Sequence, residues 1–404
     1  MATSPQQPGQ RRRGGSPRGA APSRPPRTPL WLRRTVFCLS LSILLIAGLG
    51  WYFYQRLDGN ISIDAATADE LRRYEEGRPR PAATGAQNIL LIGSDDRSGG
   101  NRKYGRPTSG ERSDTVILLH LAGDRKSVTA ISLPRDLMVQ IPRCRAKDGR
   151  HSGSQLNQFN FAYSFGGAAC TIRVVETMTG IRVDHHLILD FTGFKEMVDA
   201  VDGVEVCVPK PVDDKAARLR LKAGRQTLDG EQALGWVRAR KTLGDGSDTD
   251  RMRRQQEFLA SLVSKVKSDG VLFNPLRLAP LLDSATKSLT TDKGLSDLTA
   301  LYELVRGVRD VPMEEVHFLT VPRRPYRLNT NRDELVQPDA SRLFQALRED
   351  EPVPFGSKAD NRAEGAVPLL RTAAYVGEPG PVRAADPGDE PTYNGTTPAD
   401  DICR

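Results

Sequence analysis

A run of twenty residues without a charge or a proline, residues 35–54, constrains this chain more than any other feature. In a helix that rises about 1.5 Å per residue, such a run matches the roughly 30 Å hydrocarbon core of a membrane. Trp51, Tyr52 and Tyr54 gather at its end, and aromatic side chains favour the membrane interface. The run is too long for the apolar core of a cleaved signal peptide, so we expect a retained transmembrane helix.

The charge distribution predicts the orientation of that helix. The chain has 58 Lys and Arg against 50 Asp and Glu, which gives a formal charge of +8. Residues 1–34 contain eight arginines, no lysine and no acid, so the rest of the chain is neutral in total. The positive-inside rule then places the N-terminus in the cytoplasm and the bulk of the chain outside the cell. A neutral remainder also argues against nucleic acid as a partner, an alternative that rests on the arginine tail alone.

Composition divides the chain further. Residues 1–34 are rich in Pro, Gly, Ser and Arg, and residues 351–404 are rich in Pro, Gly and acids, so we expect both to be disordered. Residues 55–85 are polar and charged, and we expect them to form a stalk between the membrane and an exported domain. Residues 86–350 are expected to form that domain.

Strand-like and helical patterns alternate within the expected domain. Apolar runs with β-branched residues predict strands at residues 88–93, 114–121, 127–133, 137–141, 186–191, 204–208 and 316–321. Helical patterns cover residues 170–179, 191–201, 229–237, 250–267, 295–308 and 339–348. Most strands are continuous apolar runs, which is typical of strands buried on both faces. The expected fold class is α/β, a single-pass membrane anchor followed by one exported domain with a central mixed sheet flanked by helices.

The five cysteines agree with an exported domain. They include no Cys-x-x-Cys pair, which argues against a zinc ribbon or a thioredoxin-like site. Cys38 lies in the apolar run and Cys403 in the C-terminal tail. We favour a disulfide between Cys144 and Cys170, since both lie in loop or helix-start contexts, with three free thiols as the alternative. Cys207 lies inside an apolar strand and is interpreted as a core residue.

Arginine and aspartate occur together at four strand or helix ends. In chain order, these groups are Asp95 with Arg97, Arg112 with Asp114, Arg135 with Asp136, and Arg238, Arg240, Asp248, Arg251, Arg254 and Gln255. Ligands of open α/β sheets bind beyond the carboxyl ends of the strands. Guanidinium groups bind phosphate oxygens in pairs, and Mg²⁺ is held by one or two carboxylates together with phosphates. The four groups together predict a polyphosphate site with a divalent metal, whereas any one of them alone is better explained as solvated surface charge.

Spacing refines this prediction. Arg251, Arg254 and Gln255 are three and four residues apart, so they share one face of a helix. Arg238 and Arg240 converge only if the chain is extended between them. The chain has no Walker phosphate-binding loop and no Gly-x-Ser-x-Gly nucleophile elbow. The five histidines show no metal-ligand spacing and are interpreted as structural.

Seven motifs occur in the order that is found in the LytR-CpsA-Psr family: GSDDR, RSDT, SLPRD, NFAYSFGG, DFTGFKEMVDAVDGVEVCV, LDGEQALGWVRAR and DTDRMRRQQ. The sequence resembles this family over about residues 86–270, and only loosely over residues 270–350. The family is known for enzymes anchored in the bacterial cell membrane, which move glycopolymers from polyprenyl-pyrophosphate carriers onto peptidoglycan. The resemblance therefore implies an exported transferase of cell-wall assembly.

The resemblance also implies roles for individual residues. Asp95 and Asp114 resemble the metal-associated aspartates of the family. Its pyrophosphate-binding arginines are matched by Arg112, Arg135, Arg238, Arg240 and Arg251. Asp248 and Gln255 match the acid and the glutamine of the last motif. Asn160 lies in a matching Asn-x-Ala-Tyr stretch and, with Arg97 and Arg254, is expected to contact the substrate.

The expected function is a phosphotransferase dependent on Mg²⁺ (or Mn²⁺). A peptidoglycan hydroxyl would attack the phosphorus next to the glycan, and polyprenyl phosphate would leave while arginines and the metal stabilise the spreading charge. Asp95, Asp114 and Asp248 are alternatives for the general base. The lipid needs an apolar cleft, for which the candidates, also compatible with an ordinary core, are Phe159, Phe161, Phe165, Phe191 and Phe194. Two other functions stay open: a polyprenyl-pyrophosphate pyrophosphatase, and a non-catalytic lipid-binding regulator of the cell envelope.

Overall fold

The computed structural model describes residues 29–94, 113–146, 148–239, 243, 248–268, 275–356, 392–401 and 403. The chain divides into two compact units, Met1–Phe53 and Tyr54–Arg404. In the first unit the described residues belong to α1 (Leu30–Asp58), a helix long and apolar enough to cross a membrane. The expected helix is therefore present, and it could serve as a single membrane anchor.

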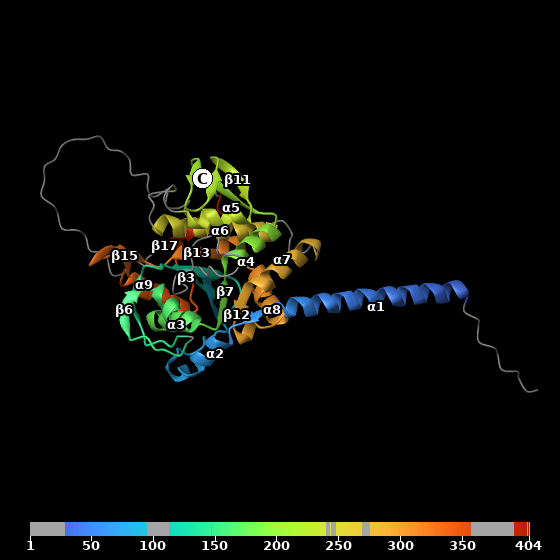
Figure 1. Ribbon diagram of the computed structural model, residues 1–404, viewed down its shortest axis with the longest axis horizontal. Helices are drawn as coiled ribbons and strands as arrows, with labels where there is room; N and C mark the ends of the chain where they lie inside the picture. The colour runs from blue at the N-terminus through green and yellow to red at the C-terminus, as the bar shows by residue number, and fades with distance from the viewer. Residues whose placement is uncertain are drawn as a thin grey trace, which may run out of the picture. The chain divides into compact units, whose positions relative to one another are not determined.

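The second unit is built on a mixed sheet (Figure 1). Nine of the described strands form it, in the order β1-β12-β7-β2-β3-β4-β13-β17-β16. Their bounds are Ser62–Ile63 (β1), Gln87–Ser94 (β2), Ser113–Leu121 (β3), Val128–Leu133 (β4), His185–Leu189 (β7), Leu289–Thr291 (β12), Val316–Thr320 (β13), Phe355–Gly356 (β16) and Tyr393–Thr396 (β17). β2 runs parallel to β7 and antiparallel to β3, while β4 runs antiparallel to β3 and parallel to β13. The carboxyl ends of β2, β4, β7 and β13 therefore lie beside the amino end of β3, at the same edge of the sheet. This edge is formed by the ends of the strands and not by an outermost strand.

Helices cover both faces of the sheet, as expected for a domain of this class (Figure 1). Leu90 and Ile92 of β2 pack with α2 (Ala65–Arg72), α3 (Phe161–Thr179) and α9 (Asp339–Glu349). The helices that pack elsewhere are α4 (Phe191–Ala200), α5 (Gly230–Arg238), α6 (Asp248–Ser268), α7 (Pro275–Ser288) and α8 (Leu298–Arg309). Among them, α6 and α8 contribute to a core cluster on the opposite face of the sheet. Successive side chains of a strand point to opposite faces of the sheet, so the helices on each side bury the apolar side chains of one face.

Four two-stranded sheets lie outside the central sheet. They pair β5 (Met138–Ile141) with β6 (Gln155–Gln158), β8 (Val204–Val208) with β11 (Gly224–Leu228), β9 (Val212–Asp214) with β10 (Leu219–Leu221), and β14 (Arg323–Tyr326) with β15 (Asn329–Leu335). Short 3₁₀-helices span Glu75–Gly77, Lys293–Leu295 and Met313–Glu315. The strand predicted at residues 204–208 is thus not part of the central sheet. Its burial alternates, with Glu205 exposed, because only the face that bears Val204, Val206 and Val208 packs into a core.

The segment expected to be a stalk is instead part of the folded unit. Leu57 is buried, β1 pairs with β12, and Leu71 of α2 joins the main core. Arg78 forms a buried ion pair with Glu176 of α3 at 2.7 Å. The stalk prediction is wrong. The buried apolar residues of this segment are isolated in the sequence, and they form no periodic pattern long enough to predict a helix or a strand.

The C-terminal tail is likewise not wholly without structure. β17 pairs antiparallel with β13, so residues beyond 350 extend the central sheet, while residues 357–391 lie outside the described part. Cys144 and Cys170 form the expected disulfide. Cys207 forms a second disulfide with Cys403, which corrects its interpretation as an unbonded core residue. This pairing joins positions 196 residues apart, a contact that no local pattern indicates.

Candidate active site

The expected Arg–Asp groups that the structure describes lie at one edge of the central sheet. Asp114 is the second residue of β3, and Arg135 follows the end of β4, which is the neighbouring antiparallel strand. Antiparallel pairing therefore places the start of one strand beside the end of the other. Their side chains meet, with Nη1 of Arg135 donating to Oδ1 of Asp114 at 3.0 Å.

Arg135 is surrounded by carboxylates. Its Nε lies 3.2 Å from Oδ2 of Asp136 and 3.5 Å from Oδ1 of Asp248, in addition to the contact with Asp114. Burial is the largest influence on the Arg135 pKa and acts to lower it. The charges of Asp136, Asp248 and Asp114 together outweigh burial, so the pKa is raised above its ordinary value. The guanidinium is thus held charged at this edge of the sheet.

The start of α6 contributes the second half of the charged network. Asp248 is the first residue of this helix, and its Oδ1 lies 2.8 Å from Nη2 of Arg251 one turn later. Arg251 is almost fully buried, and its Nε has no hydrogen-bond partner among the described residues. A buried guanidinium nitrogen without a protein partner is suited to an anionic ligand that reaches it.

An apolar cavity of about 440 Å³ opens beside these residues. Its walls are formed by β2, β3, β7 and β12 of the sheet and by α4, α5 and α6. Most lining side chains are aliphatic or aromatic: Leu91, Ile92, Ile117, Leu187, Leu189, Phe191, Phe194, Met197, Leu234, Val237, Phe258, Leu259 and Leu289. Polar lining residues are Ser94, Asp114, Thr115, Arg135, Asp190, Arg238, Arg251 and Gln255. A long apolar chain with an anionic end fits such a lining.

The end of α5 adds Arg238 to this cavity. The helix stops at Arg238 and Ala239 has extended backbone angles, which is the condition under which Arg238 and Arg240 were expected to converge. The Arg238 guanidinium lies over the Phe191 ring, 4.5 Å from its centroid. Gln255 donates from Nε2 to the carbonyl of Val237 at 3.1 Å, so α6 and the end of α5 are held together.

Two expected substrate contacts do not line the cavity. Arg254 is buried and donates to the backbone carbonyl of Ala239, and burial lowers its pKa. This side chain supports the turn after α5 rather than reaching the cavity. Asn160 is buried at the start of α3, where its backbone N–H donates to the carbonyl of Arg135 at 3.0 Å. It therefore positions the Arg135 backbone.

Part of the predicted site cannot be placed. Asp95, Arg97, Arg112 and Arg240 lie outside the described residues. Of the predicted aromatic lining, Phe191 and Phe194 face the cavity, whereas Phe159, Phe161 and Phe165 belong to the core on the other side of the sheet. The aliphatic lining was missed because it arises from alternate positions of strands that also form the core.

The described residues include no group of three or more His, Cys, Asp or Glu side chains that could hold a metal ion. Asp114 is nevertheless a carboxylate at the cavity, about one third exposed and beside Arg135. Such a donor fits a cation like Mg²⁺, which takes one or two protein carboxylates and completes its shell with water and phosphate oxygens.

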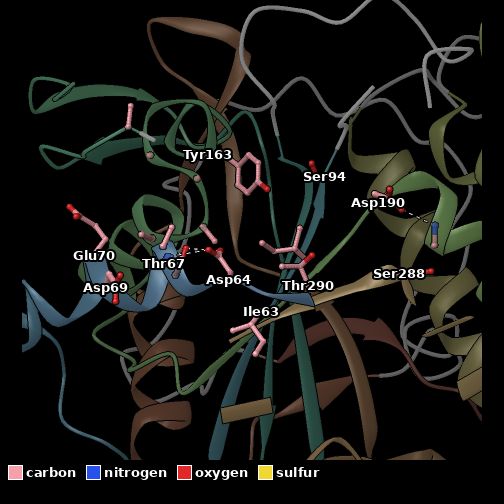
Figure 2. A pocket seen from close by; sticks show the side chains of 18 of the residues that line it. Ile63, Asp64, Thr67, Asp69, Glu70, Ser94, Tyr163, Asp190, Ser288 and Thr290 are labelled. Carbon is pink, nitrogen blue, oxygen red and sulfur yellow. Dashed lines mark hydrogen bonds between the residues drawn. The ribbon is translucent and has the colours of Figure 1, made fainter. Parts of the chain in front are cut away.

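A second hollow, which we call the polar cleft, was not anticipated from the sequence. It has a volume of about 780 Å³ and lies between α2, α3, α4 and the ends of β1 and β12. Figure 2 shows its labelled side chains, which include Asp64, Thr67, Tyr163 and Thr290. Ser94 and Asp190 line both the polar cleft and the apolar cavity.

Comparison with known proteins decides the family. Residues 57–349 match the model of the LytR_cpsA_psr family. The chain belongs to the LytR-CpsA-Psr family. The match begins at Leu57, inside the segment that had been expected to form a stalk, and so agrees with the fold.

Similar proteins of the LytR-CpsA-Psr family include two from bacteria. The cell wall biosynthesis protein LcpA of Corynebacterium glutamicum is 31% identical, over 85% of this chain and 71% of that protein. The polyisoprenyl-teichoic acid–peptidoglycan teichoic acid transferase TagV of Bacillus subtilis is 28% identical, over 77% of this chain and 76% of that protein. These names describe cell-wall proteins, one of them a transferase.

Solved structures of the family share the fold. The crystal structure of B. subtilis TagV superimposes with a TM-score of 0.52 and 26% identity, covering 67% of this chain and 99% of that one. A LytR-Csp2A-Psr enzyme from Actinomyces oris gives a TM-score of 0.53 at 24% identity, covering 67% and 93% of the two chains.

Proposed function

We propose that this protein transfers a glycopolymer from a polyprenyl-pyrophosphate carrier to peptidoglycan during cell-wall assembly. The observation that carries the proposal is an apolar cavity whose polar residues include three arginines, Arg135, Arg238 and Arg251. A polyprenyl chain is apolar and its pyrophosphate is anionic, so one ligand satisfies both parts of the lining. The named activity of TagV, a teichoic acid transferase acting on peptidoglycan, supports the same reaction class.

In the proposed reaction, the oxygen of an acceptor hydroxyl forms a bond to the phosphorus that bears the glycan. The bond from this phosphorus to the bridging oxygen breaks, and polyprenyl monophosphate leaves with the electron pair. The products are a glycan joined to peptidoglycan through a phosphodiester and the lipid monophosphate. The hydroxyl proton passes to a carboxylate, for which Asp114 is the one of the three predicted alternatives that lines the cavity among the described residues.

The arginines stabilise this reaction electrostatically. Negative charge spreads over the phosphoryl oxygens in the transition state, and fixed guanidinium groups bind that charge without reorganising. Asp248 holds Arg135 and Arg251 in place through its shared Oδ1. A bound Mg²⁺ or Mn²⁺ at Asp114 would supply further charge neutralisation on the phosphate oxygens.

In this proposal α1 anchors the enzyme in the bacterial cell membrane, and the arginine-rich tail keeps the N-terminus in the cytoplasm. The second unit is then exported and works beside the lipid carrier and the peptidoglycan. Two disulfides in the second unit support an oxidising environment outside the cytoplasm.

The test is a transfer assay with the full chain in nanodiscs. The substrates are a polyprenyl-pyrophosphate-linked oligosaccharide with a labelled glycan and purified peptidoglycan, with and without Mg²⁺. We expect label on the peptidoglycan, release of polyprenyl monophosphate, and loss of both on chelation with recovery on adding Mg²⁺. Lipid phosphate and glycan phosphate formed equally without peptidoglycan would instead identify a pyrophosphatase.

A regulatory role is the second candidate, because a similar protein of Staphylococcus aureus, 28% identical over 62% of this chain, bears the name regulatory protein MsrR. Binding of the lipid-linked substrate without any turnover, with or without peptidoglycan and metal, would favour this role over transfer.

A further inference from the structure

We propose that the polar cleft binds sugar residues of a glycan chain, directly beside the pyrophosphate end of the apolar cavity. The inference rests on the proposed function, because it concerns the sugar part of the donor or of the acceptor, as distinct from the lipid and its pyrophosphate. Two glycans could supply these sugars: the glycopolymer attached to the lipid, or the peptidoglycan acceptor.

The position of the cleft follows from the alternation of side chains along β7. Leu187 and Leu189 line the apolar cavity, whereas Ile188 between them lines the polar cleft. Neighbouring side chains of a strand point to opposite faces, so the two hollows lie on opposite faces of the sheet. They meet at Ser94 and Asp190, which follow or end the strands at the arginine-bearing edge.

This geometry matches a substrate with two chemically different ends. A lipid pyrophosphate that bears a glycan is apolar on one side of its phosphates and rich in hydroxyl groups on the other. With the lipid in the apolar cavity and the phosphates at Arg135, the next groups along the molecule lie at the shared rim of Ser94 and Asp190. The polar cleft is the hollow that continues from this rim on the other face.

The lining of the cleft suits sugar hydroxyls, which both donate and accept hydrogen bonds. It offers hydroxyl side chains from five different elements, namely Thr67, Tyr163, Thr192, Ser288 and Thr290. It also offers charged side chains of both signs, which include Arg145 and Glu196. Within the described part of the chain, neither Arg145 nor Glu196 has an ion-pair partner, so both can bind a ligand.

The walls of the cleft are held by contacts behind them. Asp64 caps α2 by accepting from the Thr67 N–H at 3.1 Å, and its Oδ2 lies 3.5 Å from Nε2 of buried His186. On the opposite wall, α3 departs from helical geometry at Gly166 and Gly167. Gly167 has a φ of +62°, which favours glycine, and a Cβ built on it would meet nothing within 4 Å. Exposed backbone at this point gives a ligand room to approach.

The experiment separates the glycan contribution from the lipid contribution. The full chain in nanodiscs binds either polyprenyl pyrophosphate without sugar or the same lipid bearing an oligosaccharide, and both affinities are measured. We expect the oligosaccharide to tighten binding by about tenfold or more in the wild type. In the double variant Arg145→Ala with Glu196→Ala, this gain should disappear while the affinity for the sugar-free lipid is unchanged. Arg143→Ala, an exposed arginine two residues from Arg145 that does not line the cleft, is the matched control.

A second arm identifies the source of the sugars. Soluble peptidoglycan fragments and the lipid-free oligosaccharide are titrated separately against the same protein by nuclear magnetic resonance. Cleft-dependent binding of the peptidoglycan fragment assigns the acceptor, and cleft-dependent binding of the oligosaccharide assigns the donor. The inference is overturned if neither glycan binds in a way that the double variant abolishes and the oligosaccharide adds nothing to lipid affinity. Failure of the proposed function is distinguishable, because the sugar-free lipid pyrophosphate would then not bind the wild type.

Discussion

The carboxylate of Asp248 is shared between Arg251, at 2.8 Å, and Arg135, at 3.5 Å. Arg251 lies on the same helix as Asp248, whereas Arg135 comes from the end of β4, more than a hundred residues earlier. One aspartate thus fixes the relative positions of two arginines that the proposed reaction needs side by side.

Replacing Asp248 by asparagine should destabilise the protein. The substitution keeps the side-chain size but removes the counter-charge of buried Arg251, and breaking such a pair costs about 3 kcal/mol of unfolding free energy. Urea denaturation of both proteins measures the change. Asp213→Asn removes one side of an exposed ion pair with Arg220 and should leave stability unchanged. Equal stability of Asp248→Asn and wild type would contradict the network.

Replacing Arg135 by alanine should lower the rate of transfer by about 100-fold or more, since a preorganised positive charge is lost from the phosphoryl group. Arg135→Lys should recover only part of the rate, because lysine cannot bind two oxygens in the fork geometry of arginine. The transfer assay with labelled glycan measures both rates. Exposed Arg220→Ala serves as the control, and full activity of Arg135→Ala would exclude the assigned role.

Filling the apolar cavity should act on the lipid alone. Met197 of α4 lines this cavity, so Met197→Trp should weaken binding of a long polyprenyl pyrophosphate by roughly tenfold. Binding of a short-chain, soluble analogue should change much less, because its lipid does not reach as far. Met313→Trp places the same bulk outside the cavity lining as a control. Equal losses for both lipid lengths would show that the cavity does not hold the chain.

The disulfide between Cys144 and Cys170 should stabilise the folded unit. It closes a loop of 26 residues, for which the loss of chain entropy in the unfolded state corresponds to about 3 kcal/mol. The double variant Cys144→Ser with Cys170→Ser should lose this amount in urea denaturation. Cys38→Ser, which changes a free and exposed cysteine of α1, should not alter the unfolding of the second unit.

The contribution of His185 to the free energy of unfolding should decrease at alkaline pH. Its hydrogen bond to Asp292 raises the pKa above the ordinary 6.5, while burial acts in the opposite direction. The contribution is therefore complete below about pH 6.5 and is lost as the pH rises through the raised pKa. The difference in unfolding free energy between wild type and His185→Gln should be large near pH 6 and small near pH 9. Exposed His151→Gln is the control, and a difference independent of pH would contradict the prediction.

The sequence predicted the elements whose patterns are local. Nearly every predicted strand and helix is present within a few residues, since a strand such as β3 is a continuous apolar run and a helix such as α4 begins at a capping aspartate, Asp190. Local patterns did not predict the structure of residues 55–85 or of β17. These segments are held by contacts with distant parts of the chain, and their own residues carry no period.

For the site, the residue types could be predicted from the sequence: arginines and aspartates at the ends of strands, in motifs that resemble one family. Which of these side chains meet depends on how the elements pack. Arg251 reaches the cavity while its neighbour Arg254 turns to a backbone carbonyl, a choice made by packing against α5. The apolar cavity and the polar cleft could not be predicted from the sequence. A cavity is the space left between packed elements, and its position depends on which helices cover each face of the sheet. Leu187 and Ile188 are alike as residues, and only the pleat of β7 separates an apolar cavity from a polar cleft.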